Sequence, residues 1–553
     1  MILLALAMVC STATVLWLSR GGTYWHDDLA WFMYTPGLSP SDALEPHYGH
    51  LVLMPRLLYK AVLETLGADY VTFRVLLAIA VTSTAGLFFV YARRRVGDLA
   101  ALIPTVLLLF LGAAWVHLVI PTGVTVLSGV ALGLGALIGL DRGDRRGDVA
   151  ACVLLCVGAA TYSTAIPYLV ASGVAIMIAP NRLRRSWIFL IPLGLYATWF
   201  VLARQAGAGP GDQVDFVNVL LAPEWALDSF ALVLSSLSGL GYSFSDAPAG
   251  AEANIDLETG RVLAVAALVG LAWHVRRRGI SAGLWVALAV PLVYWTMGAG
   301  AAGIEARVPE LSRYVYPGVV GVLLVVVEVF RDRRLPLRWL GAIAAVAALA
   351  LATNLILLRD GARHYRGTYS GDARAQLTAF DLARGTVSPD FDPTLFEGST
   401  SVLGSAWSAL RRAGEQPTAT YLDASSRYGS PGFSVPELER QSETVRARTD
   451  VVLAAALELS LESGGPPDER RCESVSASAG GTSSSPLPAG GAYLRARDPA
   501  TTAVRVRRFA TLATVSVGTL SGDWVELKVP SDDSPNPWYV SVDARELELC
   551  PLD

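Results

Sequence analysis

The sequence predicts a mainly α-helical membrane protein, in which a polytopic transmembrane helical bundle is followed by an extracytoplasmic α/β domain that ends in β-strands. Of the 553 residues, 53% are hydrophobic and only 17% are charged, against about 25% charged in an average soluble domain. Long apolar runs recur from Met1 to about Leu358 and then stop. The formal net charge of −4 gives no indication of a nucleic-acid partner.

The apolar runs divide the chain into a transmembrane domain, residues 1–358, and a tail, residues 359–553. At roughly 20 residues per span, they predict about eleven spans. The first is expected to be an uncleaved membrane helix, because no Lys or Arg precedes it and no small-residue cleavage site is clear. The spans lie near residues 2–19, 70–91, 99–119, 121–140, 149–163, 164–180, 186–203, 261–275, 281–298, 314–330 and 336–358.

Five arginine-rich loops set the predicted orientation in the cell membrane. Each follows an even-numbered span, so all five fall on one side, and short loops rich in Lys and Arg stay cytoplasmic. The N-terminus is therefore expected in the cytoplasm, whereas the first outer loop, residues 20–69, and the tail are expected outside it. The arginine-rich loops contain Arg93–Arg95, Arg142/Arg145/Arg146, Arg182/Arg184/Arg185, Arg276–Arg278 and Arg331/Arg333/Arg334.

The tail is predicted to begin with helices and to end in antiparallel strands, where apolar and polar residues alternate. The Gly/Ser/Pro-rich stretch 474–491 between them is predicted to be a flexible surface loop. Cys472 and Cys550 are the only cysteines of the tail, and a tail outside the cytoplasm would allow them to pair as a disulfide or to stay free. The helices are expected near 372–384 and 399–413, and the strands near 503–508, 511–517 and 524–529.

The first outer loop opens with two adjacent carboxylates, Asp27 and Asp28. Two carboxylates that touch raise the pKa of one of them, which helps a base to work near neutral pH. One would then act as a general base, while the other orients an acceptor or a metal ion. The flanking Trp25, Trp31 and Phe32 would form a wall against which a sugar stacks. The alternative is a solvated pair that caps the next short helix, beside aromatic residues of the membrane interface.

The same loop holds His26, His47 and His50, half of the six histidines, together with Arg56. These side chains are candidates for binding a phosphate or a sugar through hydrogen bonds. Structural hydrogen bonding is the alternative for each of them. A zinc site formed by the three histidines is the least favoured alternative, because their spacing matches no standard zinc pattern.

A later outer loop ends at Arg313, with Glu305, Arg307 and Glu310 before it and Tyr314 opening the next span. A guanidinium group forks well onto phosphate oxygens and would stabilise the negative charge that grows on a leaving group. Arg313 and Tyr314 are therefore candidates for holding a phosphate. The alternative is a set of ion pairs within the loop.

Together, the first membrane helix, the long first loop with its paired acidic residues, the number of spans and the extracytoplasmic tail resemble the GT-C glycosyltransferases. Protein O-mannosyltransferases and aminoarabinose transferases are the nearest analogues. The stretch His26-Asp27-Asp28 resembles the acidic motif of the family's first loop, with Asp27 at the position of the catalytic aspartate. Mannosyltransferases usually show Asp-Glu where this chain has Asp-Asp. Ser312-Arg313-Tyr314 is similar to late-loop segments of several bacterial members. The tail matches no family.

The resemblance implies an inverting transfer of a sugar from a polyprenyl-phosphate lipid to an envelope glycan, lipid or protein. Nucleotide sugars do not cross a bilayer, so outward-facing carboxylates need a donor that is delivered on that side. Asp27 would take the proton of the attacking hydroxyl or amine, and the lipid phosphate would leave toward Arg313 and Arg56. Because arginine alone can neutralise that phosphate, no cofactor is required and a divalent metal is optional.

Two other classes of function would use the same features. A transporter or flippase for a lipid-linked envelope glycan would use the aromatic and cationic groups for binding alone. An envelope scaffold would bind a glycan or a protein through its tail. Its function would then depend on residues beyond about Gly361 rather than on Asp27.

Overall fold

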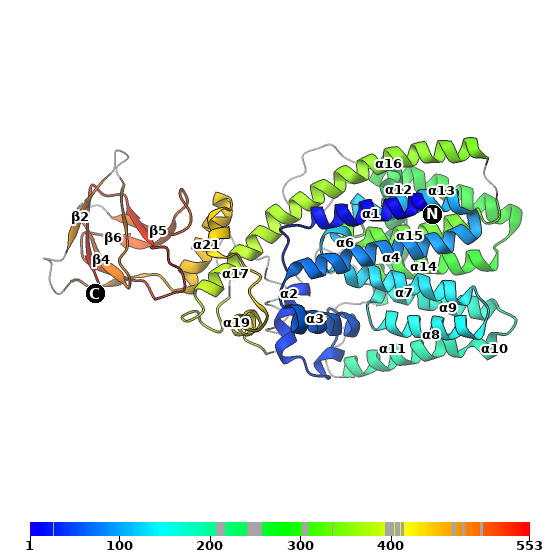
Figure 1. Ribbon diagram of the computed structural model, residues 1–553, viewed down its shortest axis with the longest axis horizontal. Coiled ribbons are helices and arrows are strands. Elements are labelled where there is room, and N and C mark those ends of the chain that lie inside the picture. Colours follow the sequence, from blue (N-terminus) through cyan, green and yellow to red (C-terminus); the bar gives the residue numbers. More distant parts are fainter. Residues whose placement is uncertain are drawn as a thin grey trace. The chain divides into compact units, whose positions relative to one another are not determined.

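The chain forms two compact units (Figure 1). The helical unit combines Met1–Arg20, Leu38–Val62 and Val71–Tyr365, and the tail unit combines Gly21–Gly37, Leu63–Tyr70 and Arg366–Asp553. The computed structural model describes residues 1–25, 27–205, 216–240, 257–300, 308–333, 336–392, 403, 407, 410, 414–466, 472–477, 482–497 and 501–552.

The division between the units differs from the predicted one at residue 358. Helix α16, Leu337–His364, continues past that residue without interruption. Two pieces of the first loop belong to the tail unit, where α2, Asp27–Tyr34, packs against α19, Pro417–Tyr428. A sequence pattern marks where apolar runs stop, but it does not show which distant segments pack together.

The helices lie where the spans are predicted, but not all of them are long enough to cross a membrane. Within the described residues, eight helices are long and apolar enough to cross a membrane, and Ile2–Leu18 and Ser163–Ile178 are shorter apolar helices. Each predicted span falls on a helix or, for 99–119, on a broken helix. The chain is thus a multi-pass membrane protein. Its helices up to α15 are α1 (Ile2–Leu18), α3 (Leu53–Leu66), α4 (Tyr70–Val96), α5 (Asp98–Leu109), α6 (Trp115–Val119), α7 (Gly123–Leu140), α8 (Arg145–Ala159), α9 (Ile166–Ile178), α10 (Arg182–Arg185), α11 (Trp187–Gln205), α12 (Ala222–Ser238), α13 (Leu257–Arg278), α14 (Ala282–Gly300) and α15 (Ser312–Val329).

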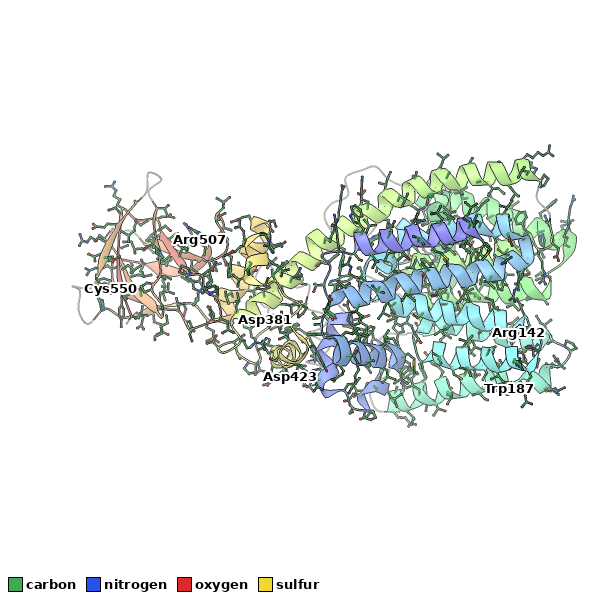
Figure 2. All side chains as sticks on the ribbon, in the orientation of Figure 1. Arg142, Trp187, Asp381, Asp423, Arg507 and Cys550 are labelled. Atoms are coloured by element: carbon green, nitrogen blue, oxygen red, sulfur yellow. A yellow bond between two sulfur atoms is a disulfide. The ribbon has the colours of Figure 1, made fainter. Side chains whose placement is uncertain are left out.

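The arginine-rich loops meet at one end of the helical unit. Figure 2 shows Arg142 and Trp187 at this end. Arg95 forms ion pairs with Asp141 and Glu328, Arg185 pairs with Asp148, and Nη2 of Arg333 lies 3.2 Å from Nδ1 of His274. Because His274 lies in the last turns of α13, these contacts connect all five loops. The five loops, each of which follows an even-numbered predicted span, therefore lie at the same end of the helical unit.

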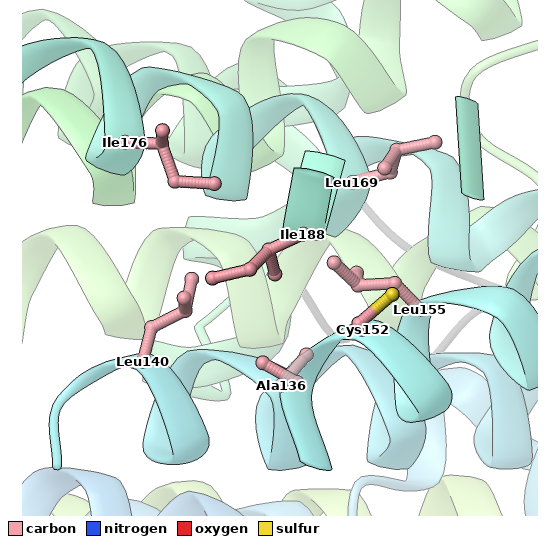
Figure 3. Packing of buried hydrophobic residues seen from close by; sticks show 8 residues of the cluster. Ala136, Leu140, Cys152, Leu155, Leu169, Ile176 and Ile188 are labelled. Atoms are coloured by element: carbon pink, nitrogen blue, oxygen red, sulfur yellow. The ribbon is translucent and has the colours of Figure 1, made fainter. Parts of the chain in front are cut away.

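Apolar side chains between the helices form the core of the helical unit. Figure 3 shows one cluster, in which α7, α8, α9 and α11 meet around Ile188. Cys152 is part of this cluster and is a free cysteine, as is its neighbour Cys156. Both behave as small hydrophobic residues, which is usual for buried thiols.

Helix α12 packs against several helices of the helical unit. It contacts α13, α14, α15 and α16. Small residues allow this approach. A Cβ on Gly260 of α13 would lie 2.3 Å from the carbonyl oxygen of Ala231 and 2.4 Å from Oγ of Ser235.

The span predicted at 99–119 is a broken helix. Helix α5 ends at Leu109, a 3₁₀ turn follows at Gly112–Ala114, and α6 then begins. A Cβ on Gly112 would lie 1.7 Å from the carbonyl oxygen of Asn354 in α16, so only glycine permits this contact. The side chain of Asn354 accepts a hydrogen bond from the N–H of Ala113 (3.3 Å), which satisfies a backbone group that the break would leave unpaired.

The tail unit joins short helices to a β-sandwich. Two antiparallel sheets have the strand orders β1-β7-β4-β9-β2 and β3-β8-β5-β6. Side chains alternate between buried and half-buried along β5 and most of β4, as expected when one face of each sheet packs in the core. The elements are the π-helical segment Tyr365–Ser370, α17 (Gly371–Leu382), α19, α20 (Val435–Glu439), α21 (Glu443–Ala456), β1 (Leu461–Ser463), β2 (Glu473–Ser476), β3 (Ser483–Pro486), β4 (Gly491–Ala496), β5 (Thr502–Arg507), β6 (Val515–Leu520), β7 (Val525–Lys528), β8 (Tyr539–Val542) and β9 (Glu546–Pro551).

Two predictions for the tail have clear outcomes. Cys472 and Cys550 form a disulfide, one of the two expected alternatives; Cys550 is labelled in Figure 2. The prediction of a flexible loop over 474–491 is wrong where the structure describes it, because β2 and β3 lie there. Strand β3 is serine-rich, but it pairs with β8 and buries Ser483, whose hydroxyl donates to the carbonyl oxygen of Ala544 (2.9 Å). The helix predicted at 399–413 lies mostly outside the described residues.

Candidate functional site

The two adjacent carboxylates begin α2, but they differ in exposure. The side chain of Asp28 is fully buried, whereas that of Asp27 is half-buried. Asp28 accepts hydrogen bonds from the backbone N–H of Trp25 and from the hydroxyl of Tyr70 (2.7 Å). Its own N–H donates to the carbonyl oxygen of Trp25 (3.3 Å). These bonds tie the first turn of α2 to the segment before it, and the burial of Asp28 does not agree with a solvated side chain.

The environment of Asp28 changes its acidity. The pKa of this carboxyl group is raised to about 8, mainly by burial and to a smaller extent by the negative charge of Asp27. The hydrogen bonds from Tyr70, Trp25 and Leu29 lower the pKa but do not offset the burial. Burial therefore favours the protonated form of Asp28.

Aromatic residues surround the pair within the tail unit. The rings of Tyr24 and Tyr70 are 4.8 Å apart, and those of Trp25 and Tyr369 are 4.7 Å apart. The predicted sugar-stacking role of Trp31 and Phe32 does not fit their positions, because these side chains are 2% and 0% exposed and belong to the core. Trp25 remains half-buried.

Sequence reasoning missed the residues that the tail unit supplies to this environment. Tyr369 lies in the π-helical segment, and Tyr421 of α19 packs against Phe32 with ring centroids 6.4 Å apart. Both follow the acidic pair by more than 300 residues in the sequence. No local motif marks them, so only the fold identifies them.

The other predicted binding residues belong to the helical unit, except His26, which lies outside the described residues. His47 and His50 form a tight turn in which each backbone N–H donates to the other's carbonyl oxygen (2.9 Å). Tyr48 and Gly49 between them both have positive φ, 47° and 82°. Glycine adopts a positive φ without steric cost, which explains its presence at position 49. The ring of His50 packs against that of Tyr162, with centroids 4.6 Å apart.

Arg56 stabilises the first loop. Its side chain is only 7% exposed, and Nη1 donates to the carbonyl oxygens of Asp42 and of Glu45 (2.7 Å). These bonds give Arg56 a structural role in positioning the segment that leads to His47. Structural hydrogen bonding was the alternative to phosphate binding for Arg56, and its contact with a phosphate stays a prediction.

Arg313 and Tyr314 open α15. Ser312 fixes this helix end, because its hydroxyl donates to the carbonyl oxygen of Ala113 (2.7 Å). Arg313 is exposed, and its Cζ lies 5.5 Å from the ring centroid of Tyr314. The ring of Tyr314 packs against that of Trp225, with centroids 5.8 Å apart. Glu305 and Arg307, the proposed ion-pair partners, lie outside the described residues.

The predicted residues thus divide between the two units. Asp27 and Asp28 belong to the tail unit, whereas His47, His50, Arg56, Arg313 and Tyr314 belong to the helical unit. Among the described residues, no group of three His, Cys, Asp or Glu side chains is arranged to hold a metal ion. The predicted zinc site combines His47 and His50 with His26. Because His26 lies outside the described residues, the structure does not show all three ligands of this site.

Comparisons with known proteins give one similarity in structure. No family model and no curated protein matches the chain. A crystal structure of ArnT from Cupriavidus metallidurans bound to undecaprenyl phosphate matches 74% of this chain and 88% of the ArnT chain, with 11% sequence identity and a TM-score of 0.44. At this identity and TM-score neither fold nor activity can be carried over.

Proposed function

We propose that the protein is an integral-membrane glycosyltransferase. It transfers a sugar from a polyprenyl-phosphate donor to an acceptor of the cell envelope. The observation that supports this most is the unequal acidic pair, in which Asp28 is buried and hydrogen-bonded to Tyr70 while Asp27 is half-buried. Neighbouring carboxyl groups in different environments are typical of sites that move protons.

In the proposed reaction, Asp27 removes the proton from an acceptor hydroxyl or amine as its oxygen or nitrogen attacks the anomeric carbon. The new glycosidic bond forms while the bond from that carbon to the phosphate oxygen breaks, and the lipid phosphate keeps the electron pair. This displacement inverts the anomeric centre. Arg313 balances the negative charge of the departing phosphate. Asp28 acts as a positioning residue, because its hydrogen bonds fix the first turn of α2.

The location of the reaction follows from the orientation of the chain. The arginine-rich loops share one end of the helical unit, and such loops remain cytoplasmic. The disulfide of the tail unit favours an oxidising compartment. Both observations support a reaction outside the cytoplasm, where the sugar donor must be carried by a lipid.

The test compares Asp27→Asn with Asp28→Asn in proteoliposomes. The readout is incorporation of labelled sugar from polyprenyl-phosphate donors into a cell-envelope fraction. We expect Asp27→Asn to lose about 10²- to 10⁴-fold in rate, the usual contribution of a general base, with unchanged expression. Full activity of this variant would end the assignment. Movement of the lipid across the membrane without sugar transfer would instead identify a flippase.

A further inference from the structure

His117 is a buried histidine that the proposed reaction does not use. It lies in α6, and its side chain is 4% exposed. Its Nδ1 has no hydrogen-bond partner within the part of the chain that the structure describes. Buried polar atoms almost always have a partner, and in the apolar part of a membrane no bulk water supplies one.

The backbone around His117 is fixed by close contacts. A Cβ on Gly123 would lie 2.4 Å from the carbonyl oxygen of His117, so the chain turns tightly after α6. Ser312 of α15 donates to the carbonyl oxygen of Ala113 (2.7 Å) and accepts a hydrogen bond from the N–H of Val116 (3.4 Å). These bonds hold the start of α15 against the residue before His117. Arg313 is next to Ser312, and its positive charge acts on His117.

Other buried polar groups lie in the same part of the helical unit. The hydroxyls of Tyr168 in α9 and Tyr316 in α15 have no hydrogen-bond partner among the described residues. Tyr294 of α14 lies near both Tyr168 and Arg313, and Tyr316 lies near Tyr168. Helix α14 packs against both α9 and α15. Several unpaired donors around one arginine suit a ligand with several acceptor oxygens.

We infer that His117 binds the phosphate of the lipid donor together with Arg313. This inference rests on the proposed function and adds one residue to its donor site. A cation is disfavoured beside Arg313, and a neutral sugar would not need the guanidinium group. A phosphate accepts hydrogen bonds from both groups, since the imidazole donates Nδ1–H to one oxygen and the guanidinium donates to others.

The experiment measures binding of farnesyl phosphate, a short polyprenyl phosphate, to the full-length protein in detergent. Farnesol, which lacks the phosphate, is the control ligand. We expect His117→Leu to weaken binding of farnesyl phosphate about 10- to 100-fold, the usual effect of a hydrogen bond to a charged group. His117→Asn, whose amide nitrogen replaces Nδ1, should bind within a few-fold of the wild type. Farnesol binding should be the same in all variants.

A second histidine provides a matched control. His274 lies near the arginine-rich end and contacts Arg333, so His274→Leu should leave farnesyl phosphate binding unchanged. Melting temperatures without ligand show whether each variant is folded. Equal affinity of His117→Leu and the wild type would overturn the inference, as would a wild type that does not distinguish farnesyl phosphate from farnesol. Full sugar transfer by Asp27→Asn would end the general-base assignment while leaving the His117 result intact.

Discussion

The hydroxyl of Tyr70 donates a hydrogen bond of 2.7 Å to Oδ2 of Asp28. With the backbone N–H of Trp25 on Oδ1, both oxygens of this carboxyl group have partners inside the tail unit. Asp27, one residue earlier, begins the same helix but remains half-buried. Adjacent residues of identical chemistry thus have different roles, because the helix turns one side chain into the core and leaves the other near the surface.

The first prediction concerns pH and stability. The pKa of Asp28 is about 8 in the folded protein against 3.8 in the unfolded chain, so the folded state keeps a proton that the unfolded chain loses. Stability should therefore fall as pH rises from about 4 to about 8, by up to about 1.4 kcal/mol per pH unit, and become constant above that. Asp28→Asn does not ionise and should lack this slope. The check is the free energy of unfolding of the wild type and of Asp28→Asn, measured by denaturation from about pH 5 to about pH 9. If this free energy depends on pH in the same way for both proteins, Asp28 is ionised in the folded state and the prediction is wrong.

The second prediction concerns the buried ion pair at the arginine-rich end. The side chain of Glu328 is 0% exposed and that of Arg95 is 7% exposed, and Glu328 also accepts a hydrogen bond from Tyr91 (2.9 Å). Among the described residues, Glu328→Ala leaves Arg95 with Asp141 as its remaining ion-pair partner, and the substitution should cost about 3–5 kcal/mol. Denaturant titration in detergent measures this free energy of unfolding.

An exposed pair in the same region is the control for Glu328. Arg93 and Asp98 lie 3.0 Å apart, with side chains 38% and 54% exposed. Asp98→Ala should cost no more than about 1 kcal/mol, because such pairs are screened by water and salt. Equal losses for the two substitutions would contradict the structural role of Glu328.

The helical part of the fold was accessible from the sequence because its signals are local. Apolar runs such as 70–91 must hydrogen-bond within themselves in a membrane, so they are helices wherever they occur. The arginine clusters also act locally, and contacts such as Arg95 with Asp141 (3.0 Å) confirm that successive clusters share one end. The disulfide was predictable as one of two alternatives because the tail has two cysteines and no others.

The candidate site was predictable only in part, because its geometry depends on distant segments. The sequence identified Asp27 and Asp28, but Tyr70 follows Asp28 by 42 residues and sets its hydrogen bonding. Tyr369 belongs to a tail that was expected to be a separate domain. His117 gave no signal at all, since a single histidine in an apolar run is usually a core residue. Strand β3 was missed because pairing with β8 outweighs the low strand propensity of its serines.

The last prediction concerns the disulfide and the compartment of the tail. Cys472 precedes β2 and Cys550 lies in β9, and the bond closes a separation of 78 residues. In the native host, the protein should migrate as a disulfide-bonded monomer, and the peptides containing the two cysteines should be linked before reduction. The Cys472→Ser/Cys550→Ser double variant should be less stable by about 2–5 kcal/mol. A Cys152→Ser variant is the matched control, because Cys152 is a free cysteine of the helical unit. Two fully reduced tail cysteines in freshly isolated cells would contradict an extracytoplasmic tail, and with it the need for a lipid-linked donor.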